Sequence, residues 1–558
     1  MRDSSPALIE RLQGSGLRVV RALQLLCLIE VTGIIYVLIL RQGGFASADS
    51  RGVFIFFRLF SVYEGPAIGS LVLFTVLASL IREGSERELA RQTTTVFGRL
   101  AERFLLSVFS IAIFLFTVWG GREISLSHPL SMDEYGMLYQ AESFAAGRVV
   151  LPVPEDAREF SDAIRPVFVV NDRSGQGWIS GYSPGFSALL TPFAKGGLEW
   201  ALNPLLTVLA CLFTWLIAKH EWPDDQDRRL FAVFAIACCS QTLFVGMTLY
   251  AMPAHLAANL AWLFALRSGV RPVLAAGPIG ALAMILHQPV PHALFSAPFL
   301  LREVREKNWR RVAELGLWYL IALVGLWLWN QQLTGLRPVI GANGLIGLPE
   351  LANVAVAFMN AILILTWQTP IAAFAFVVAV MRFRIMSSFE RDLLYGVLLC
   401  LSFYLFFQMI TQGHGWGWRY GHQVLGSVIL LSASSLDDLI ALFGRWKIRV
   451  MLALSFGLTA FFQLPLRAIE VRRTTMPFSS ASAWLSSLKS PLVVIPADSL
   501  WYGRDLVRNS FTAGFPVIVN GDVLLHLSPR NQQRVLSRAR RVSVDELEKL
   551  GMERVTPR

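Results

Sequence analysis

The sequence predicts an all-α polytopic membrane protein with about thirteen transmembrane helices and a small extracytoplasmic α/β appendage at the C-terminus. Of the 558 residues, 54% are hydrophobic and only 16% are charged, whereas an ordinary soluble domain carries about 25% charged residues. The mean hydropathy is +0.51. This composition excludes a soluble globular protein, because the apolar residues suffice for some thirteen spans of about 20 residues, the length needed to cross a bilayer, and still leave loops.

The thirteen apolar runs are expected to be transmembrane helices. The shortest pair lies around Pro289 and Pro291. The stretch 348–365 is expected to lie on the outer surface as an amphipathic or re-entrant helix, because a crossing there would place the next basic cluster outside. The runs are 19–40, 65–81, 104–120, 198–218, 230–250, 252–267, 272–287, 288–301, 312–333, 366–381, 392–411, 423–442 and 449–466.

The net charge of +11 chiefly reflects how the chain is oriented in the membrane. About half of the 50 Lys and Arg residues fall in alternate gaps between the runs, and cytoplasmic loops carry such an excess. This pattern places the N-terminus in the cytoplasm and the C-terminus outside, and we expect no nucleic-acid partner. The absence of an Asn-x-Ser/Thr sequon favours a bacterial inner membrane.

These sides divide the chain into four regions. Residues 1–120 hold three transmembrane helices, 121–184 form the first extracytoplasmic loop, 185–467 form a core of about ten helices, and 468–558 form an extracytoplasmic domain. In that domain, alternating apolar residues at 492–496 and 515–520 predict strands, and 530–539 predicts a helix. No internal repeat is visible, which lowers the expectation of a repeat-built transporter.

An acidic pair, Asp133 and Glu134, follows the third predicted helix closely. Two carboxylates just outside an anionic membrane surface are electrostatically disfavoured, which indicates a general base or a metal site. The pair also fits a helix start, with Ser131 as the cap and the carboxylates in the first turn. The two interpretations are compatible, and a helix ending at Gly147 is expected to follow.

Two aromatic, glycine-rich segments lie on the same outer side. The first, 177–186, contains Tyr182, and the second, 412–422, contains His414, Arg419 and Tyr420. Alternate glycines let a backbone approach a ligand, and one Arg among aromatic residues suits a phosphate. Interfacial aromatic residues are the structural alternative. Six of the eight histidines, His128 and His414 among them, map to this side, where we expect them to line a wet cavity.

Taken together, several short motifs resemble bacterial GT-C glycosyltransferases of the protein O-mannosyltransferase and lipid A aminoarabinose transferase type. The resemblance covers most of the chain in topology. Two features depart from the family: two additional helices precede the acidic loop, and Ser183 stands where the family commonly has Pro. The motifs are Met132-Asp133-Glu134-Tyr135, Tyr139-Gln140-Ala141, Ala145-Ala146-Gly147-Arg148, Tyr182-Ser183-Pro184-Gly185, Asn203-Pro204 and Gly417-Trp418-Arg419-Tyr420.

The resemblance implies transfer of a sugar, hexosyl or pentosyl, from a polyprenyl-phosphate donor to an extracytoplasmic glycan, lipid or protein. It implies Asp133 as the catalytic acid/base and Glu134 as its partner, with both able to hold a divalent cation such as Mg²⁺ or Mn²⁺. Arg419 would face the donor phosphate, and Tyr420, His414, Tyr182 and His128 would complete the substrate site. Direct displacement would invert the anomeric carbon.

Two other functions remain open at this stage. A secondary transporter or lipid flippase would require charges buried within helices, and the sequence offers Glu30 and the pair Asp437 and Asp438. A polymerase or ligase of surface polysaccharide would also be a transferase, with a different lipid-linked donor. No nucleotide-binding glycine motif occurs.

Overall fold

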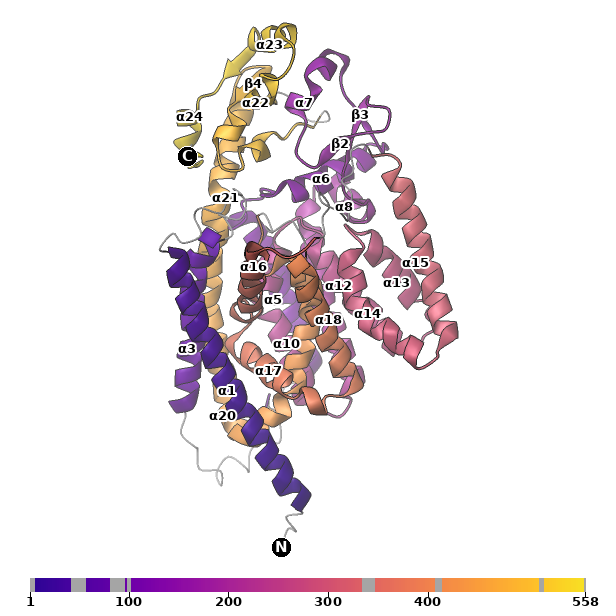
Figure 1. Ribbon diagram of the computed structural model, residues 1–558, viewed down its shortest axis with the longest axis vertical. Helices are drawn as coiled ribbons and strands as arrows, with labels where there is room; N and C mark the ends of the chain where they lie inside the picture. Colours follow the sequence, from indigo (N-terminus) through magenta and orange to yellow (C-terminus); the bar gives the residue numbers. More distant parts are fainter. Residues whose placement is uncertain are drawn as a thin grey trace.

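The computed structural model describes residues 6–41, 57–80, 96–97, 102–333, 347–406, 414–510 and 516–555. The molecule is elongated, with α1 (Pro6–Arg41) starting near one end and the C-terminal α/β unit at the other (Figure 1). Several predictions fall outside the described residues: the end of the run 392–411 beyond residue 406, the start of the segment 412–422, Phe515, and the basic residues Arg2, Arg82, Arg87, Arg91 and Arg99.

Among the described residues, six helical stretches are long and apolar enough to cross a membrane, or up to eight if each of two bent pairs is one span. The predicted count of thirteen is therefore not confirmed. The bent pairs are α10 (Gln226–Ala237) with α11 (Ser240–Gly246), at 48°, and α16 (Leu351–Thr366) with α17 (Pro370–Met381), at 119°. The six stretches are Val20–Ile39, Phe57–Leu80, Glu102–Glu123, Glu199–Glu221, Trp309–Asn330 and Leu436–Ser487.

Several predicted spans form shorter helices because the chain breaks inside or beside them. The run 230–250 divides between α10 and α11, and the pair around Pro289 and Pro291 gives α13 (Ala276–Ile285) and α14 (Val290–Arg305). The sharp bend between α16 and α17 suits a broken span or a re-entrant loop, so the non-crossing of 348–365 stays a prediction. The other helices of this region are η1 (Phe60–Glu64), α3 (Gly65–Leu80), α5 (Glu102–Glu123), α8 (Gly185–Lys195), η3 (Glu199–Ala201), α9 (Leu202–Glu221), α12 (Met252–Arg267), α15 (Trp309–Asn330), η4 (Phe383–Ile385), α18 (Ser388–Phe406), η5 (Arg419–Val424) and α19 (Leu425–Ser434).

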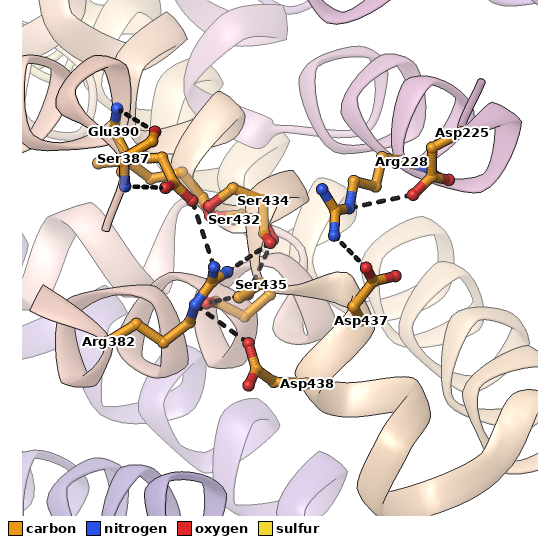
Figure 2. Close-up of polar contacts among 12 residues, drawn as sticks. Asp225, Arg228, Arg382, Ser387, Glu390, Ser432, Ser434, Ser435, Asp437 and Asp438 are labelled. Atoms are coloured by element: carbon orange, nitrogen blue, oxygen red, sulfur yellow. Dashed lines mark hydrogen bonds and ion pairs between the residues drawn. The ribbon is translucent and has the colours of Figure 1, made fainter. Parts of the chain in front are cut away.

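Ion pairs gather at the end of the bundle away from the α/β unit, where the basic clusters were predicted. Arg382 contacts Asp438 at 3.1 Å and Glu390 at 3.5 Å, and Arg228 pairs with Asp225 at 3.1 Å and with Asp437 (Figure 2). Arg382 also donates to the carbonyl of Ser434. The two aspartates that the transporter alternative relied on, Asp437 and Asp438, lie at the start of α20 (Leu436–Leu458), and each pairs with an arginine.

The loop 121–184 folds into a small outer layer. It contains α6 (Met132–Ala145), η2 (Glu155–Phe160), α7 (Ser161–Ile164) and a three-stranded antiparallel sheet in the order β1-β3-β2, of strands Leu151–Pro152, Gly177–Ser180 and Val169–Asn171. The sequence predicted the helix but not the sheet, because strands of two to four residues carry too little alternation to detect. Most of α6 is buried.

A long helical stretch with one break joins the bundle to the C-terminal unit. It consists of α20, η6 (Thr459–Gln463) and α21 (Leu464–Ser487), with one break at Gly444, where φ is 73°. The predicted domain boundary at residue 467 therefore falls inside α21. The charged residues that follow the apolar run do not end the helix, because they form ion pairs inside the protein. Arg467 is buried and pairs with Glu64 at 2.7 Å and Glu470 at 2.9 Å.

The C-terminal unit is a three-stranded parallel sheet with short helices, in the order β5-β4-β6. Two of its strands and one helix match the predicted positions, whereas β6 was not predicted. The elements are β4 (Leu492–Ile495), η7 (Ala497–Ser499), η8 (Gly503–Leu506), β5 (Val517–Asn520), α22 (Gly521–Leu524), α23 (Pro529–Leu536), β6 (Ala539–Arg541) and α24 (Val544–Glu548).

The C-terminal unit and the first outer loop pack into one layer above the bundle (Figure 1). Trp178 and Phe160 of the loop share a buried apolar cluster with Val519 and Val535 of the unit. Asn509 ties the two by donating to the carbonyl of Ile164 at 2.6 Å. Two segments more than 300 residues apart in the sequence therefore act as one cover over the helices.

Candidate functional site

A cavity of about 570 Å³ lies where the bundle meets this outer layer. Its walls come from four places: the start of α6, the turn after β3, the segment around η5, and the region of η7 and η8. Apart from the acidic pair, the sequence predicted five site residues. Four of them, Arg419, Tyr420, His414 and Tyr182, line the cavity together with Asp133.

Asp133 is held from two sides. The Arg419 guanidinium forms an ion pair with one carboxylate oxygen, and the Tyr182 hydroxyl donates to the other. Burial opposes ionisation of this carboxyl, but the Arg419 charge and the Tyr182 hydrogen bond outweigh it and hold the pKa of Asp133 below its ordinary value. Asp133 is therefore an ionised partner of Arg419 at neutral pH.

Arg419 is fixed by a set of contacts around its guanidinium. Its side chain is 2% exposed, it donates to the carbonyl of His414 at 2.7 Å, and its central carbon lies 4.2 Å from the ring centre of Tyr250. Cation–π contacts of this kind are strongest where water is excluded. The positive charge thus has one fixed position in the cavity wall.

The glycines around Arg419 make room for protein side chains and not only for a ligand. A Cβ at Gly415 would collide with the Arg419 side chain, and one at Gly417 would lie 2.9 Å from Gln241 and from Trp367. Gly417 also has a φ of 61°, which favours glycine. These glycines therefore serve the packing of the segment that presents Arg419, and their opening of the backbone to a substrate stays a prediction.

Tyr182 and Tyr420 belong to two stacked ring pairs at the cavity. Tyr182 stacks on His287 with ring centres 4.4 Å apart, and its carbonyl accepts a hydrogen bond from Trp329 at 2.9 Å. Tyr420 stacks on Tyr404 at 4.9 Å. Flat aromatic walls of this kind suit a sugar ring or a prenyl chain better than a small ion.

Glu134 lies outside the cavity lining and caps α6. One of its oxygens accepts from the backbone of Ser131 at 3.0 Å and the other from the backbone of Leu249 at 2.8 Å. The Ser131 side chain accepts from the backbone of Asp133 at 3.1 Å, which completes the predicted capping box. Burial raises the pKa of Glu134 to about 7. The structure supports the capping interpretation of Glu134, and we assign it no catalytic role.

The two predicted histidines differ in position. His128 is buried outside the cavity lining, and burial, with Arg508 and His414 nearby, lowers its pKa to about 2. His414 lines the cavity, and neither of its ring nitrogens has a hydrogen-bond partner among the described residues. Its ring packs on Tyr502 with centres 4.2 Å apart. Of these two, His414 is the one placed to meet a substrate, and His255 and His287 also line the cavity.

The acidic pair does not present a ready metal site. Within the described residues, no group of three or more His, Cys, Asp and Glu side chains is arranged to hold a metal ion. Asp133 is engaged by Arg419 and Tyr182, and both Glu134 oxygens accept backbone hydrogen bonds. The donor set that the resemblance implies for Mg²⁺ or Mn²⁺ therefore does not fit the ion here, and no step below passes through a metal.

The C-terminal unit supplies cavity residues that the sequence did not identify. Asp498, Tyr502, Arg504 and Asp505 all line the cavity. Arg504 is bound to Asp498 by two hydrogen bonds of 2.5 and 2.7 Å. A signal that could have identified them is the dense mixture of aromatic and charged residues in the segment Trp501-Tyr502-Gly503-Arg504-Asp505. Its placement could not be inferred, because the tail has no motif that links it to the membrane part.

Comparison with known proteins gives a fold likeness only. No family model matches the sequence, and no curated protein matches it. Two crystal structures of ArnT from Cupriavidus metallidurans are similar in fold, with 13% sequence identity and coverage of 80% of this chain and 90% of that chain. The TM-score is 0.48 for the apo state and 0.47 for the structure bound to undecaprenyl phosphate. We therefore argue function from the cavity itself.

Proposed function

We propose that this protein is a membrane glycosyltransferase that moves a sugar from a polyprenyl-phosphate donor to an extracytoplasmic acceptor, which is a glycan, a lipid or a protein. The observation that carries the proposal is the buried Arg419 guanidinium, held by Asp133 in the wall of a cavity that lies between apolar helices and an outer layer. A lipid-linked substrate needs this location, because its prenyl chain stays among the helices while its phosphate and sugar enter the cavity.

Arg419 is the group that would bind the donor phosphate. A guanidinium presents several N–H donors in a fixed plane and suits phosphate oxygens. Burial strengthens this attraction, since the surrounding medium screens charge less than water does. As the sugar leaves, negative charge grows on the phosphate, and a fixed cation stabilises that charge without reorganising.

The reaction is a direct displacement at the anomeric carbon. The acceptor oxygen or nitrogen attacks that carbon from the face opposite the phosphate, so the configuration inverts. The acceptor must lose a proton in this step, and a carboxylate in the cavity is the natural base. Tyr182, Tyr420 and Tyr502 supply ring surfaces at the cavity for the sugar. We place the protein in the bacterial inner membrane with the cavity on the outer side.

The direct test is transfer by the purified protein in detergent or nanodiscs. Polyprenyl phosphate carrying a labelled sugar is supplied with envelope extract as the acceptor source, and native mass spectrometry identifies the bound lipid. We expect wild-type protein to bind the donor and to transfer the label. Arg419→Gln should lose both, by about 100-fold or more, as expected for loss of a buried cation that contacts a phosphate.

The matched control is Arg554→Gln, because Arg554 pairs with Asp545 and Glu548 on the surface of the C-terminal unit. This variant should bind and transfer like wild type. In liposomes, Arg419→Gln could instead move labelled lipid across the bilayer at the wild-type rate without transferring sugar. That result would contradict the proposal and favour a transporter or flippase. Co-purification of a pyrophosphate-linked oligosaccharide would favour a polysaccharide polymerase or ligase.

A further inference from the structure

Two carboxylates from distant parts of the chain line the cavity: Asp133 at the start of α6 and Asp505 in η8. Their surroundings differ. Asp133 is bound by Arg419 and Tyr182, which favour its charged form. An acid whose charge is already neutralised by a fixed arginine is a weak proton acceptor, because accepting a proton would break that ion pair.

Asp505 has no hydrogen-bond donor to its carboxylate among the described residues. Its side chain is 10% exposed, and its Oδ2 lies 4.0 Å from Nε2 of His414, whose ring nitrogens are themselves without hydrogen bonds in the same part of the chain. Two buried polar side chains that face one cavity without partners of their own are a place where a ligand supplies the missing hydrogen bonds.

The local backbone is built to hold Asp505 at this wall. Tyr502 has the left-handed φ of 49° just before η8, and its carbonyl accepts from the Asp505 backbone at 2.9 Å. A Cβ at Gly503 would strike the carbonyl of Ala497 and would lie 2.9 Å from Leu500. The tight turn requires glycine at this point, and it fixes the direction of Asp505.

The charges around Asp505 keep it able to take up a proton near neutral pH. Burial raises the pKa of Asp505 to about 7, with Arg508 acting to lower it and Asp133 to raise it. His414 is the other titratable group in contact, and burial lowers its pKa to about 3, so it stays neutral. Two acids in one site whose pKa values are driven apart by their surroundings have different roles.

We propose that Asp505 is the general base that removes the proton from the acceptor, and that Asp133 is a positioning residue that holds Arg419 for the donor phosphate. This assignment rests on the proposed function and changes the role that the motif resemblance implied for Asp133. The C-terminal unit is then part of the catalytic site.

The step balances as follows. The acceptor O–H or N–H proton moves to a carboxylate oxygen of Asp505, while the acceptor oxygen or nitrogen forms a bond to the anomeric carbon. The bond between that carbon and the phosphate oxygen breaks, and its electron pair stays on the phosphate. The products are the glycosylated acceptor, polyprenyl phosphate and protonated Asp505, which releases its proton to water.

The test measures transfer as a function of pH in the full-length protein. A base must be deprotonated to act, so kcat/KM should fall as the pH drops through about 7, the pKa of Asp505. Asp505→Asn should reduce kcat by about 100- to 10,000-fold, remove this acid limb, and leave donor binding by native mass spectrometry unchanged. Asp133→Asn should instead weaken donor binding.

A small carboxylic acid added to the assay provides a second readout. Formate should restore part of the activity of Asp505→Ala, because the shortened side chain leaves space for the added base. Asp545→Ala is the matched control, since Asp545 is 76% exposed in the same unit and pairs with Arg554, and it should be active without formate and insensitive to it. If Asp505→Asn does not fold, the wild-type pH profile and the formate response of Asp505→Ala still test whether Asp505 is the base.

Wild-type kcat and an unchanged acid limb in Asp505→Asn would overturn the assignment while leaving the proposed function intact. A wild-type profile that is flat between pH 5.5 and 8 would also overturn it. Absence of sugar transfer by the wild-type protein with every acceptor source would defeat the proposed function, and the assignment with it.

Discussion

Single residues in the cavity differ in role according to what already binds them. Asp133 and Glu134 are neighbours in sequence, yet Asp133 meets Arg419 in the cavity while Glu134 accepts two backbone N–H groups behind it. The sequence places both in the first turn of a helix, and the capping pattern identifies Glu134 correctly. It could not identify Asp505, because the contact between that residue and His414 joins segments about 90 residues apart.

Arg508 should set the position of the acid limb proposed for Asp505. It lowers the pKa of Asp505 by its charge and donates to the Asp505 carbonyl at 2.8 Å. Arg508→Gln removes the charge, so the pKa of Asp505 rises and the acid limb of kcat/KM moves to higher pH. Arg508→Lys should stay nearer the wild-type profile. An acid limb that moves to lower pH in Arg508→Gln would contradict this electrostatic relation.

Glu134 should matter for stability more than for chemistry. Glu134→Ala removes the acceptor for the Ser131 and Leu249 backbones, and loss of a helix cap costs about 1 kcal/mol. We expect a lower unfolding temperature, followed by tryptophan fluorescence in detergent. Glu134→Gln keeps one acceptor and should unfold between the two. A loss of activity in Glu134→Gln as large as in Asp133→Asn would instead indicate a direct role for Glu134.

At the scale of elements, short turns hold many of the cavity residues, and long helices form most of the fold. The apolar runs predicted where most helices lie, since hydrophobicity is written locally along the chain. The runs separated 348–365 from 366–381, where α16 and α17 meet at a sharp bend, but they did not predict the break between α10 and α11 within 230–250. Nor did they predict the outer antiparallel sheet, because its strands of two to four residues are too short to show alternation.

Gly503 provides a test of turn geometry separate from side-chain chemistry. Gly503→Ala adds a Cβ against the carbonyl of Ala497, so the turn must shift and Asp505 must move with it. We expect kcat to fall at least tenfold with little change in donor binding. Gly457→Ala is the control, because no atom lies within 4 Å of the added Cβ, and its kcat should be unchanged. Wild-type kcat in Gly503→Ala would show that the turn does not position the base.

At the scale of the whole molecule, the predicted cytoplasmic arginines and the two sheets lie toward opposite ends (Figure 1). Two of the predicted cytoplasmic arginines, Arg228 and Arg382, form the ion pairs drawn in Figure 2, whereas both sheets lie toward the opposite end of the molecule (Figure 1). The positive-inside pattern could predict this arrangement because it depends on which gaps hold arginines. It could not predict that the first loop and the tail form one layer, since their shared apolar cluster has no signature in either segment.

Sidedness can be measured with a membrane-impermeant maleimide. Ser537 is exposed in the C-terminal unit and Arg445 is exposed at the other end, and Cys27 is the one native cysteine described as exposed. In a Cys27→Ser background, Ser537→Cys should be labelled in intact spheroplasts and Arg445→Cys only after lysis. The reverse order of labelling would place the cavity on the cytoplasmic side and exclude an extracytoplasmic acceptor.

The long helical stretch from Leu436 to Ser487 has a consequence for how the cavity is assembled. After its break at Gly444 it stays helical to Ser487, rising about 1.5 Å per residue, and four residues separate its end from the first strand of the C-terminal unit. A flexible linker would let that unit drift, and its local concentration at the cavity would fall with linker length. A helical connection restricts this drift, which keeps Asp505 and Arg419 in the wall of the same cavity.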